Sequence, residues 1–520
     1  MEQHISYKRA TILVMIITLL SKITGFLREI LLGSAYGATY VTDAYLVALT
    51  IPQTLFASIA AAIGTTYIPL YSRIRVEEGP EEAVRFTNRV LNVVVFVSTA
   101  LAVVGMVFTR PIVSLIAMGF KGEVLKLAIS FTRITFPMII FIGMCQVFMS
   151  FLQANNEFTL PALIGIPNNM IIIATLLLSG MVGPYGLVVG TLVGSVIQVA
   201  VLLPGVFKKD YRYRRVLSFK DSYVVKVVAL ALPVMLGSTV QQLNALIDRM
   251  LASGLPEGSI AALNFANKLN GFAYGIFTIS LATVIYPLLS RLSAEKDMAG
   301  FKDKLVKSLN VITLIILPIT VGAVVLRRPI VSVLFERGQF DARATAMTAS
   351  ALMFYSLGMV FYGYRDVLNK TFYSLQNTKT PMLNGVLTVL CNIVLNLILV
   401  RFMQHNGLAL ATSLSAMIMT FLLFINLRKR IGGIGGKKLI GAFLKCGIAS
   451  LIMGIVVYWL DGIAAEYLSL SSTIMRFLIL TLEIGLGALL YFALVYLFRV
   501  EEAKWIVDMA KRRLGILRQK

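Results

Sequence analysis

Residues 11–33 read TILVMIITLLSKITGFLREILLG, an apolar run long enough to cross a membrane that also carries Lys22, Arg28 and Glu29. A charge at bilayer depth costs at least a few kcal/mol, so it normally faces a bundle interior or a water-filled cavity. On a helix, Lys22 and Glu29 share one face with Arg28 beside them, and Gly25 removes bulk there. This run therefore predicts cations presented to an anionic group. Alternatively, the side chains of Arg28 and Glu29 extend to the nearby membrane–water interface. This alternative fits Lys22 less well, because Lys22 lies deeper in the segment.

Composition places the whole chain in a membrane. Of its 520 residues, 58% are hydrophobic and 14% are charged, and the mean hydropathy is +0.83. These values predict an all-α polytopic membrane protein with about fourteen transmembrane helices, because no soluble domain of this size is so apolar. The predicted segments are 11–33, 41–70, 86–108, 124–152, 158–180, 184–206, 222–252, 260–290, 303–326, 344–374, 380–401, 407–428, 437–460 and 471–498.

The formal net charge of +23 reflects basic loops rather than a nucleic-acid surface. Basic residues gather after the second, sixth, eighth and twelfth segments and in the tail at 511–520. All of these lie on one side if both termini are cytoplasmic, as the positive-inside rule predicts. The loop holding Arg327, Arg328, Arg337 and Arg343 falls on the other side and weakens the pattern. Basic loops of this kind also suit anionic membrane lipids.

Cysteine and histidine offer little chemistry here. The three cysteines are spread over separate apolar runs, and the two histidines are isolated. This distribution predicts no disulfide framework and no histidine-based metal site. No nucleophile stands beside a general base in the sequence, so we expect a protein that is not an enzyme and needs no cofactor, a sodium ion excepted.

Three motifs recur in order along the chain. Residues 68–73 (IPLYSR) return as 286–291 (YPLLSR), 110–115 (RPIVSL) as 328–333 (RPIVSV), and 186–191 (GLVVGT) as 407–412 (GLALAT). The spacing of about 220 residues covers six helices, an even number, so both copies insert with the same orientation. Such repeats predict two parallel six-helix lobes around a central cavity. We expect an N-lobe at 1–207, a cytoplasmic basic linker at 208–221, a C-lobe at 222–430, and two further helices with the tail at 431–520.

Other ionisable residues also lie in apolar segments. Asp43 begins the second segment, Lys268 lies in the eighth, and Arg365-Asp366 lies in the tenth. Arg365-Asp366 suits a structural ion pair and a functional pair equally well. Lys22, Arg28 and Lys268 outnumber Glu29 and come from both lobes. A surplus of cations in a cavity predicts an anionic substrate, and arginine suits phosphate through its bidentate fork.

Asn392 and Asn396 are four residues apart and so share a helix face. Together with Asp248 and Thr412 from neighbouring segments, they form a candidate all-oxygen cation site. Composition alone favours a simpler explanation, in which the two amides hydrogen-bond between helices, as is common in membranes.

The chain resembles the MurJ/MviN family of lipid II flippases, which belongs to the superfamily that includes the MATE exporters. The stretches that carry the resemblance are 21–29 (SKITGFLRE), 42–45 (TDAY), 67–69 (YIP), 264–269 (NFANKL), 286–288 (YPL) and 372–381 (FYSLQNTKTP). The similarity covers nearly the whole chain and agrees with fourteen helices arranged as two lobes plus two.

The resemblance implies a flippase that moves lipid II across the bacterial cytoplasmic membrane by alternating access, with no covalent step. It implies a substrate-binding set of Lys22, Arg28, Glu29, Asp43 and Lys268. It also implies a sodium site at Asp248, Asn392, Asn396 and Thr412. Partners would be lipid II and membrane lipids, with no nucleic acid, and the protein would be monomeric.

Two departures from the family pattern bear on this set. Lysine replaces arginine at 22 and 268, which keeps the charge but loses the fork, so Arg28 is the best candidate for the diphosphate. Many members also carry arginine and glutamate within the second helix, where this chain reads QTLFASIAAA at 53–62.

Three other functions compete with this prediction. A flippase for another polyprenyl-diphosphate saccharide would look the same, since nothing in the sequence identifies the sugar or the peptide. A cation-coupled MATE-like exporter would favour acidic and aromatic cavity residues. A membrane glycosyltransferase would need clustered acidic residues and usually a soluble part.

Overall fold

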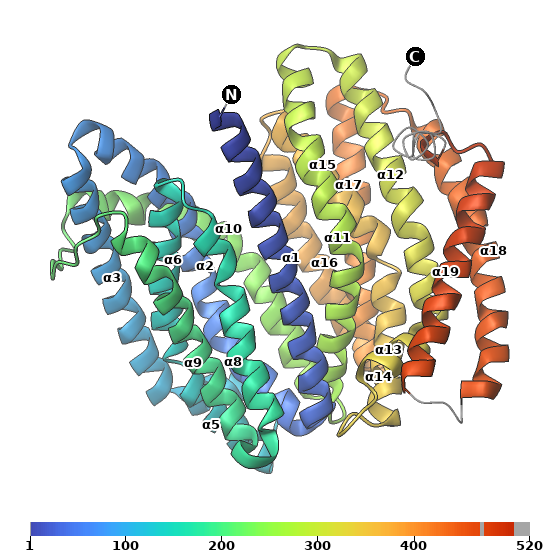
Figure 1. Ribbon diagram of the computed structural model, residues 1–520, viewed down its shortest axis with the longest axis horizontal. Coiled ribbons are helices and arrows are strands. Elements are labelled where there is room, and N and C mark those ends of the chain that lie inside the picture. Colours follow the sequence, from blue (N-terminus) through green and yellow to red (C-terminus); the bar gives the residue numbers. More distant parts are fainter. Residues whose placement is uncertain (1, 469–472, 504–520) are drawn as a thin grey trace. The chain divides into compact units, whose positions relative to one another are not determined.

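The computed structural model describes residues 2–468 and 473–503, and these ranges fold into α-helices without a strand (Figure 1). The predicted basic tail at 511–520 lies outside the described residues. The first ten helices are α1 (Glu2–Tyr36), α2 (Tyr40–Glu77), α3 (Pro80–Val107), α4 (Thr109–Ile116), α5 (Gly122–Thr135), α6 (Met138–Ala154), α7 (Thr159–Leu163), α8 (Gly165–Leu177), α9 (Ser179–Phe207) and α10 (Ser222–Ser253). The remaining nine are α11 (Ser259–Ala294), α12 (Met298–Val325), α13 (Arg327–Phe335), α14 (Ala342–Ser356), α15 (Met359–Ser374), α16 (Lys379–Met403), α17 (His405–Ile431), α18 (Gly436–Leu468) and α19 (Thr473–Leu497).

The predicted all-α membrane fold is confirmed. Among the described residues, ten helices are long and apolar enough to cross a membrane, or eleven if the bent pair α14–α15 is one span. Each of the fourteen predicted segments coincides with a helix or with two consecutive helices. Three of them, 124–152, 158–180 and 344–374, are divided in the structure. The first breaks at Pro137, which cannot donate a backbone hydrogen bond, the second breaks at Ile164 between α7 and α8, and the third bends by 44° at Gly358.

The internal repeat is visible in the backbone as well as in the sequence. Residues with positive φ recur in pairs 217 to 222 residues apart. The pairs are Gly37 and Gly258, Gly79 and Lys296, Asn156 and Gln376, Gly183 and Gln404, and Asp210 and Gly432. A left-handed residue is uncommon outside glycine, so five coincidences in order are not accidental. The two copies therefore share their turns as well as their helices.

The helices group into two compact units. The first contains residues 1–261 and 337–340, and the second contains 262–336 and 341–520. In this grouping α10 belongs with the first nine helices, whereas the repeat places it at the start of the C-lobe. The lobe boundaries drawn from the repeat stay a prediction.

Each unit has its own packed interior. In the first, the Tyr67 ring stacks on Phe86 with centroids 5.4 Å apart, and its hydroxyl lies 2.6 Å from that of Thr87. In the second, α11, α12, α15 and α17 enclose a buried cluster that includes Leu289, Phe301 and Leu309. The last two helices, α18 and α19, pack on α12, where the Tyr491 hydroxyl donates to the Leu314 carbonyl at 2.8 Å. Close packing of this kind holds membrane helices together, because lipid tails are as apolar as the helix side chains and burial away from lipid provides little driving force.

The basic linker, called here the α9–α10 connector (208–221), is fixed along α3. The Asn88 side chain donates to the Arg212 carbonyl at 2.9 Å and accepts from the Tyr211 hydroxyl at 2.8 Å and from the Arg214 amide at 3.0 Å. One turn later, Asn92 donates to two more connector carbonyls. Burial raises the pKa of the Tyr211 phenol, so this hydroxyl keeps its proton and remains a donor. The connector is therefore an ordered part of the first unit.

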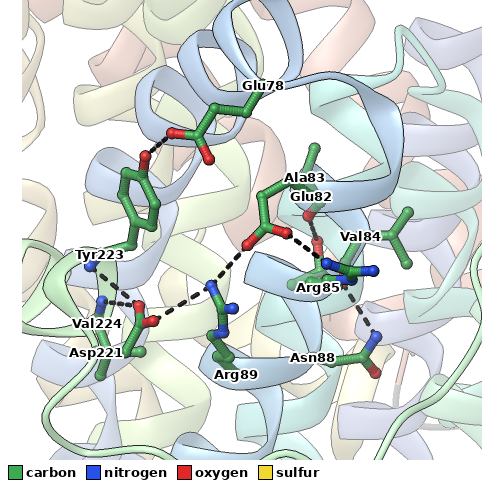
Figure 2. A network of polar contacts seen from close by, with 11 residues as sticks. Glu78, Glu82, Ala83, Val84, Arg85, Asn88, Arg89, Asp221, Tyr223 and Val224 are labelled. Atoms are coloured by element: carbon green, nitrogen blue, oxygen red, sulfur yellow. Dashed lines mark hydrogen bonds and ion pairs between the residues drawn. The ribbon is translucent and has the colours of Figure 1, made fainter.

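A charged network closes the connector onto α10 (Figure 2). Asp221 caps α10 by accepting from the Tyr223 and Val224 amides at 3.0 and 3.2 Å, and it pairs with Arg89 at 3.2 Å. Arg89 also pairs with Glu82 in the first turn of α3, at 2.8 Å. The start of α10 is thus held against α3 by ion pairs between side chains as well as by the connector.

Candidate functional site

The guanidinium of Arg28 on α1 is held in place by a side chain of α8. The Arg28 Nη2 atom lies 2.6 Å from Glu29 Oε1, and its Nη1 atom donates to Asn169 Oδ1 at 3.1 Å. The Asn169 amide in turn donates to the Ser21 carbonyl and the Thr24 hydroxyl, both at 3.2 Å. Asn169 therefore bridges two turns of α1 and orients the guanidinium. These two bonds use two of the five N–H donors of Arg28, so others can take an anion.

Glycine allows α1 and α8 to approach this closely. A Cβ on Gly165 would lie 2.1 Å from Ser21 Oγ, and one on Gly25 would lie 3.4 Å from Asn169 Nδ2. An added Cβ at 165 would therefore force the Ser21 hydroxyl to move, whereas one at 25 would be in contact with the Asn169 amide. Asn169 is a polar neighbour of Gly25 that the sequence alone did not identify.

The remaining residues around Arg28 differ in burial. The side chain of Arg28 is 25% exposed and that of Glu29 is 6% exposed, whereas Lys22 is exposed. On α2, the buried Tyr45 hydroxyl lies 2.9 Å from Thr191 Oγ1 of α9. The site therefore combines one accessible lysine with an arginine whose carboxylate partner is buried.

Asp43 has a structural task at the beginning of α11. It is buried, and its two carboxylate oxygens accept from the Gly258 and Ala261 amides, both at 2.7 Å. A negative charge at a helix N-terminus is stabilising, because it satisfies free N–H groups and the helix dipole. Gly258 is required there, since φ is +84° and a Cβ would lie 2.1 Å from the Ala38 carbonyl oxygen. The predicted part of Asp43 in substrate binding stays a prediction.

The second unit carries cations on α11 and α15. Lys268 is exposed on α11, and a cavity that it shares with the α1 residues stays a prediction. On α15, Arg365 donates from Nε and Nη2 to Asp366 Oδ1 at 3.2 and 3.1 Å, so the two form an ion pair within one helix. Lys370 lies 5.4 Å from the centre of the Tyr286 ring of α11, a cation–π contact.

The four candidate sodium ligands come from both units. Asp248 is on α10 in the first unit, while the other three are on α16 and α17 in the second. Asn396 donates to Asn392 Oδ1 at 2.9 Å, which is a bond within α16 rather than between helices. The Thr412 hydroxyl donates to its own helix at Leu408, so its oxygen can still accept or ligate. The sodium site stays a prediction.

A family model described as "Lipid II flippase MurJ" matches residues 32–479. The chain belongs to the MurJ family. It is 30% identical over 432 residues to the lipid II flippase MurJ of Burkholderia cenocepacia, covering 81% of this chain and 84% of that protein. It is 29% identical over 507 residues to the probable lipid II flippase MurJ of Vibrio cholerae, covering 95% and 96%.

Solved structures agree with membership of the MurJ family. The chain matches a structure described as "Lipid II flippase MurJ, inward closed conformation" with a TM-score of 0.78 and 28% identity, over 94% of this chain and 98% of that one. It also matches an inward-facing MATE family transporter of the MOP superfamily with a TM-score of 0.66 and 15% identity, over 81% and 98%. At that identity the second likeness concerns the fold alone.

Sequence reasoning missed two polar features of this MurJ-family chain. Asn169 was not singled out, although Asn168-Asn169 interrupts an apolar run. Glu483 was also missed, although it is an acidic residue inside the fourteenth apolar segment and is buried in the structure. Both could have been found by examining every polar residue within a predicted span.

Proposed function

We propose that this chain flips lipid II across the bacterial cytoplasmic membrane by alternating access. Family membership over residues 32–479 supports this function. The observation on this chain that carries it is Arg28, a cation within an apolar helix that Asn169 and Glu29 hold in one orientation. An arginine fixed in this way can bind the diphosphate of a lipid-linked sugar without first losing side-chain freedom.

The other predicted residues take supporting parts in this proposal. Lys22 and Lys268 add positive charge as single donors, and Glu29 limits the net charge of the cavity when no substrate is bound. Asp43 acts through the beginning of α11, because its carboxylate oxygens are already engaged by backbone amides. Sodium at Asp248, Asn392, Asn396 and Thr412 would couple ion binding to the transport cycle.

The proposal includes the setting of the protein. It works as a monomer in the cytoplasmic membrane with both termini in the cytoplasm, and its basic loops support that orientation. Transport needs binding and movement only, so no catalytic residue is proposed.

The test is complementation of a strain depleted of its lipid II flippase. We expect Arg28→Ala to fail and lipid II to accumulate, because a charge-assisted hydrogen bond contributes about 1.5–3 kcal/mol. Arg110→Ala, which removes an exposed arginine of α4, is the control and should complement. Full activity of Arg28→Ala would refute the site. Accumulation of a different lipid-linked saccharide would indicate a different substrate.

A further inference from the structure

The second unit contains a charged cavity that is separate from the residues discussed for substrate binding, since none of them lines it. It has a volume of about 450 Å³ and lies between α13, α18 and α19. Five charged side chains line it, together with a few apolar ones. They are Arg328 and Glu336 at the two ends of α13, Asp461 on α18, and Arg476 and Glu483 on α19.

The α19 face of this cavity follows helical spacing. Arg476, Ile479, Leu480 and Glu483 stand at positions i, i+3, i+4 and i+7, so all four point to the same side. Glu483 is ten residues beyond the first residue of α19, a depth of about 15 Å along the helix. The cavity therefore extends from the first turn of α19 to near the middle of this apolar helix.

Polar atoms of two oppositely charged side chains are buried in this cavity. Glu483 is 4% exposed, and its Oε1 atom has no hydrogen-bond partner among the described residues. The Nε atom of Arg476 is buried and without a partner in the same part of the chain. Within the described ranges, none of the five charged side chains forms an ion pair. A buried carboxylate is costly in a membrane unless a cation meets it.

The arrangement suits a ligand that carries both charges. A guanidinium binds phosphate, and a carboxylate accepts hydrogen bonds from a primary ammonium. A divalent metal fits poorly, because the described residues contain no group of three or more acidic, histidine or cysteine side chains placed to hold one. Both α18 and α19 are long and apolar enough to cross a membrane, and some bilayer lipids present phosphate and ammonium on one headgroup.

We propose that this cavity binds the headgroup of an aminophospholipid of the phosphoethanolamine type. Glu483 and Asp461 receive the ammonium, and Arg476 and Arg328 receive the phosphate. A phosphoglycerol headgroup offers only neutral hydroxyl donors, and a phosphocholine headgroup has no N–H to donate, so neither gives Glu483 a hydrogen bond from a cation.

The experiment measures lipid binding to the full chain in detergent by native mass spectrometry, with phosphatidylethanolamine, phosphatidylcholine and phosphatidylglycerol of the same acyl chains. A charge-assisted hydrogen bond changes an affinity about 10- to 100-fold. We therefore expect phosphatidylethanolamine to bind at least tenfold more tightly than the other two lipids. Glu483→Gln should abolish that preference, and Arg476→Gln should weaken binding of all three lipids.

Glu123→Gln, at an exposed position on α5, is the matched control and should keep the preference. If Glu483→Gln does not fold, Asp461→Asn takes its place in the comparison. Equal binding of the three lipids by the unmodified chain would overturn the proposal. So would an unchanged preference in Glu483→Gln, or unchanged binding of all three lipids in Arg476→Gln. Loss of the preference on addition of sodium or inorganic phosphate alone would also overturn it.

Discussion

Asn88→Ala should release the α9–α10 connector from α3. The substitution removes three hydrogen bonds to the connector, and each contributes about 0.5–1.5 kcal/mol net. It also leaves the buried Tyr211 hydroxyl without its acceptor, and an unsatisfied buried group costs about 1–3 kcal/mol more. We therefore expect the free energy of local opening to fall by about 3–6 kcal/mol.

Asn92→Ala is the matched control, because this residue makes the same kind of contacts one turn further along α3. Its amide donates to the Arg214 and Val216 carbonyls, and its carbonyl accepts from Tyr213, each at 3.0 Å. These bonds lie at the surface, where water can replace them, so the loss should stay below about 1.5 kcal/mol.

Hydrogen exchange measures the difference directly at the Arg214 amide, which donates to Asn88 Oδ1. Exchange there should accelerate at least about 100-fold in Asn88→Ala and less than about 10-fold in Asn92→Ala. Asn88→Asp keeps the acceptor but loses the donor to Arg212, so it should fall between them. Equal acceleration in both alanine variants, or none in either, would refute the idea that burial at Asn88 fixes the connector.

Four further predictions follow from the sites above. Lys268→Arg should support growth of the depleted strain while Lys268→Ala does not; complementation by both would remove this residue from the cavity. Asp43→Ala should lower thermal stability by about 3 kcal/mol, since two charge-assisted hydrogen bonds to α11 are lost, and unchanged melting in detergent would contradict the cap. Sodium should raise the melting temperature of the unmodified chain but not of Asp248→Ala; an equal rise in both would exclude a site at that residue. Lys296→Gly should stabilise the protein by about 0.5–1 kcal/mol because it relieves a lysine with positive φ, and Gly79→Ala should destabilise it. Denaturant unfolding that shows the opposite signs would contradict the strain assigned to these two turns.

The sequence determined most of the fold because a membrane helix must be both long and apolar. The breaks were harder to locate, since the apolar pattern continues unchanged through Pro137 and Gly358. Proline is tolerated in the first turn of a helix, so its presence alone did not indicate where the preceding helix ends.

The candidate site was only partly predictable for a different reason. Charged residues within an apolar run are easy to identify, which is why Arg28 and Glu29 were recognised. The two are adjacent in the sequence, and their side chains form an ion pair in the structure. Asn169 acts across 141 residues of sequence, and no local pattern relates it to Arg28. The connector is similar: its basic composition indicated a loop, but its order comes from Asn88, more than 120 residues earlier.

The five pairs of left-handed residues record the history of this chain in its backbone. If a single ancestral segment was duplicated, its side chains have since diverged, while the handedness of its turns has been kept. In three of the pairs one copy has glycine and the other has lysine, glutamine or aspartate. Each half therefore shows where glycine can replace a residue with positive φ in the other half. Stabilising substitutions can be chosen in this way from this one sequence.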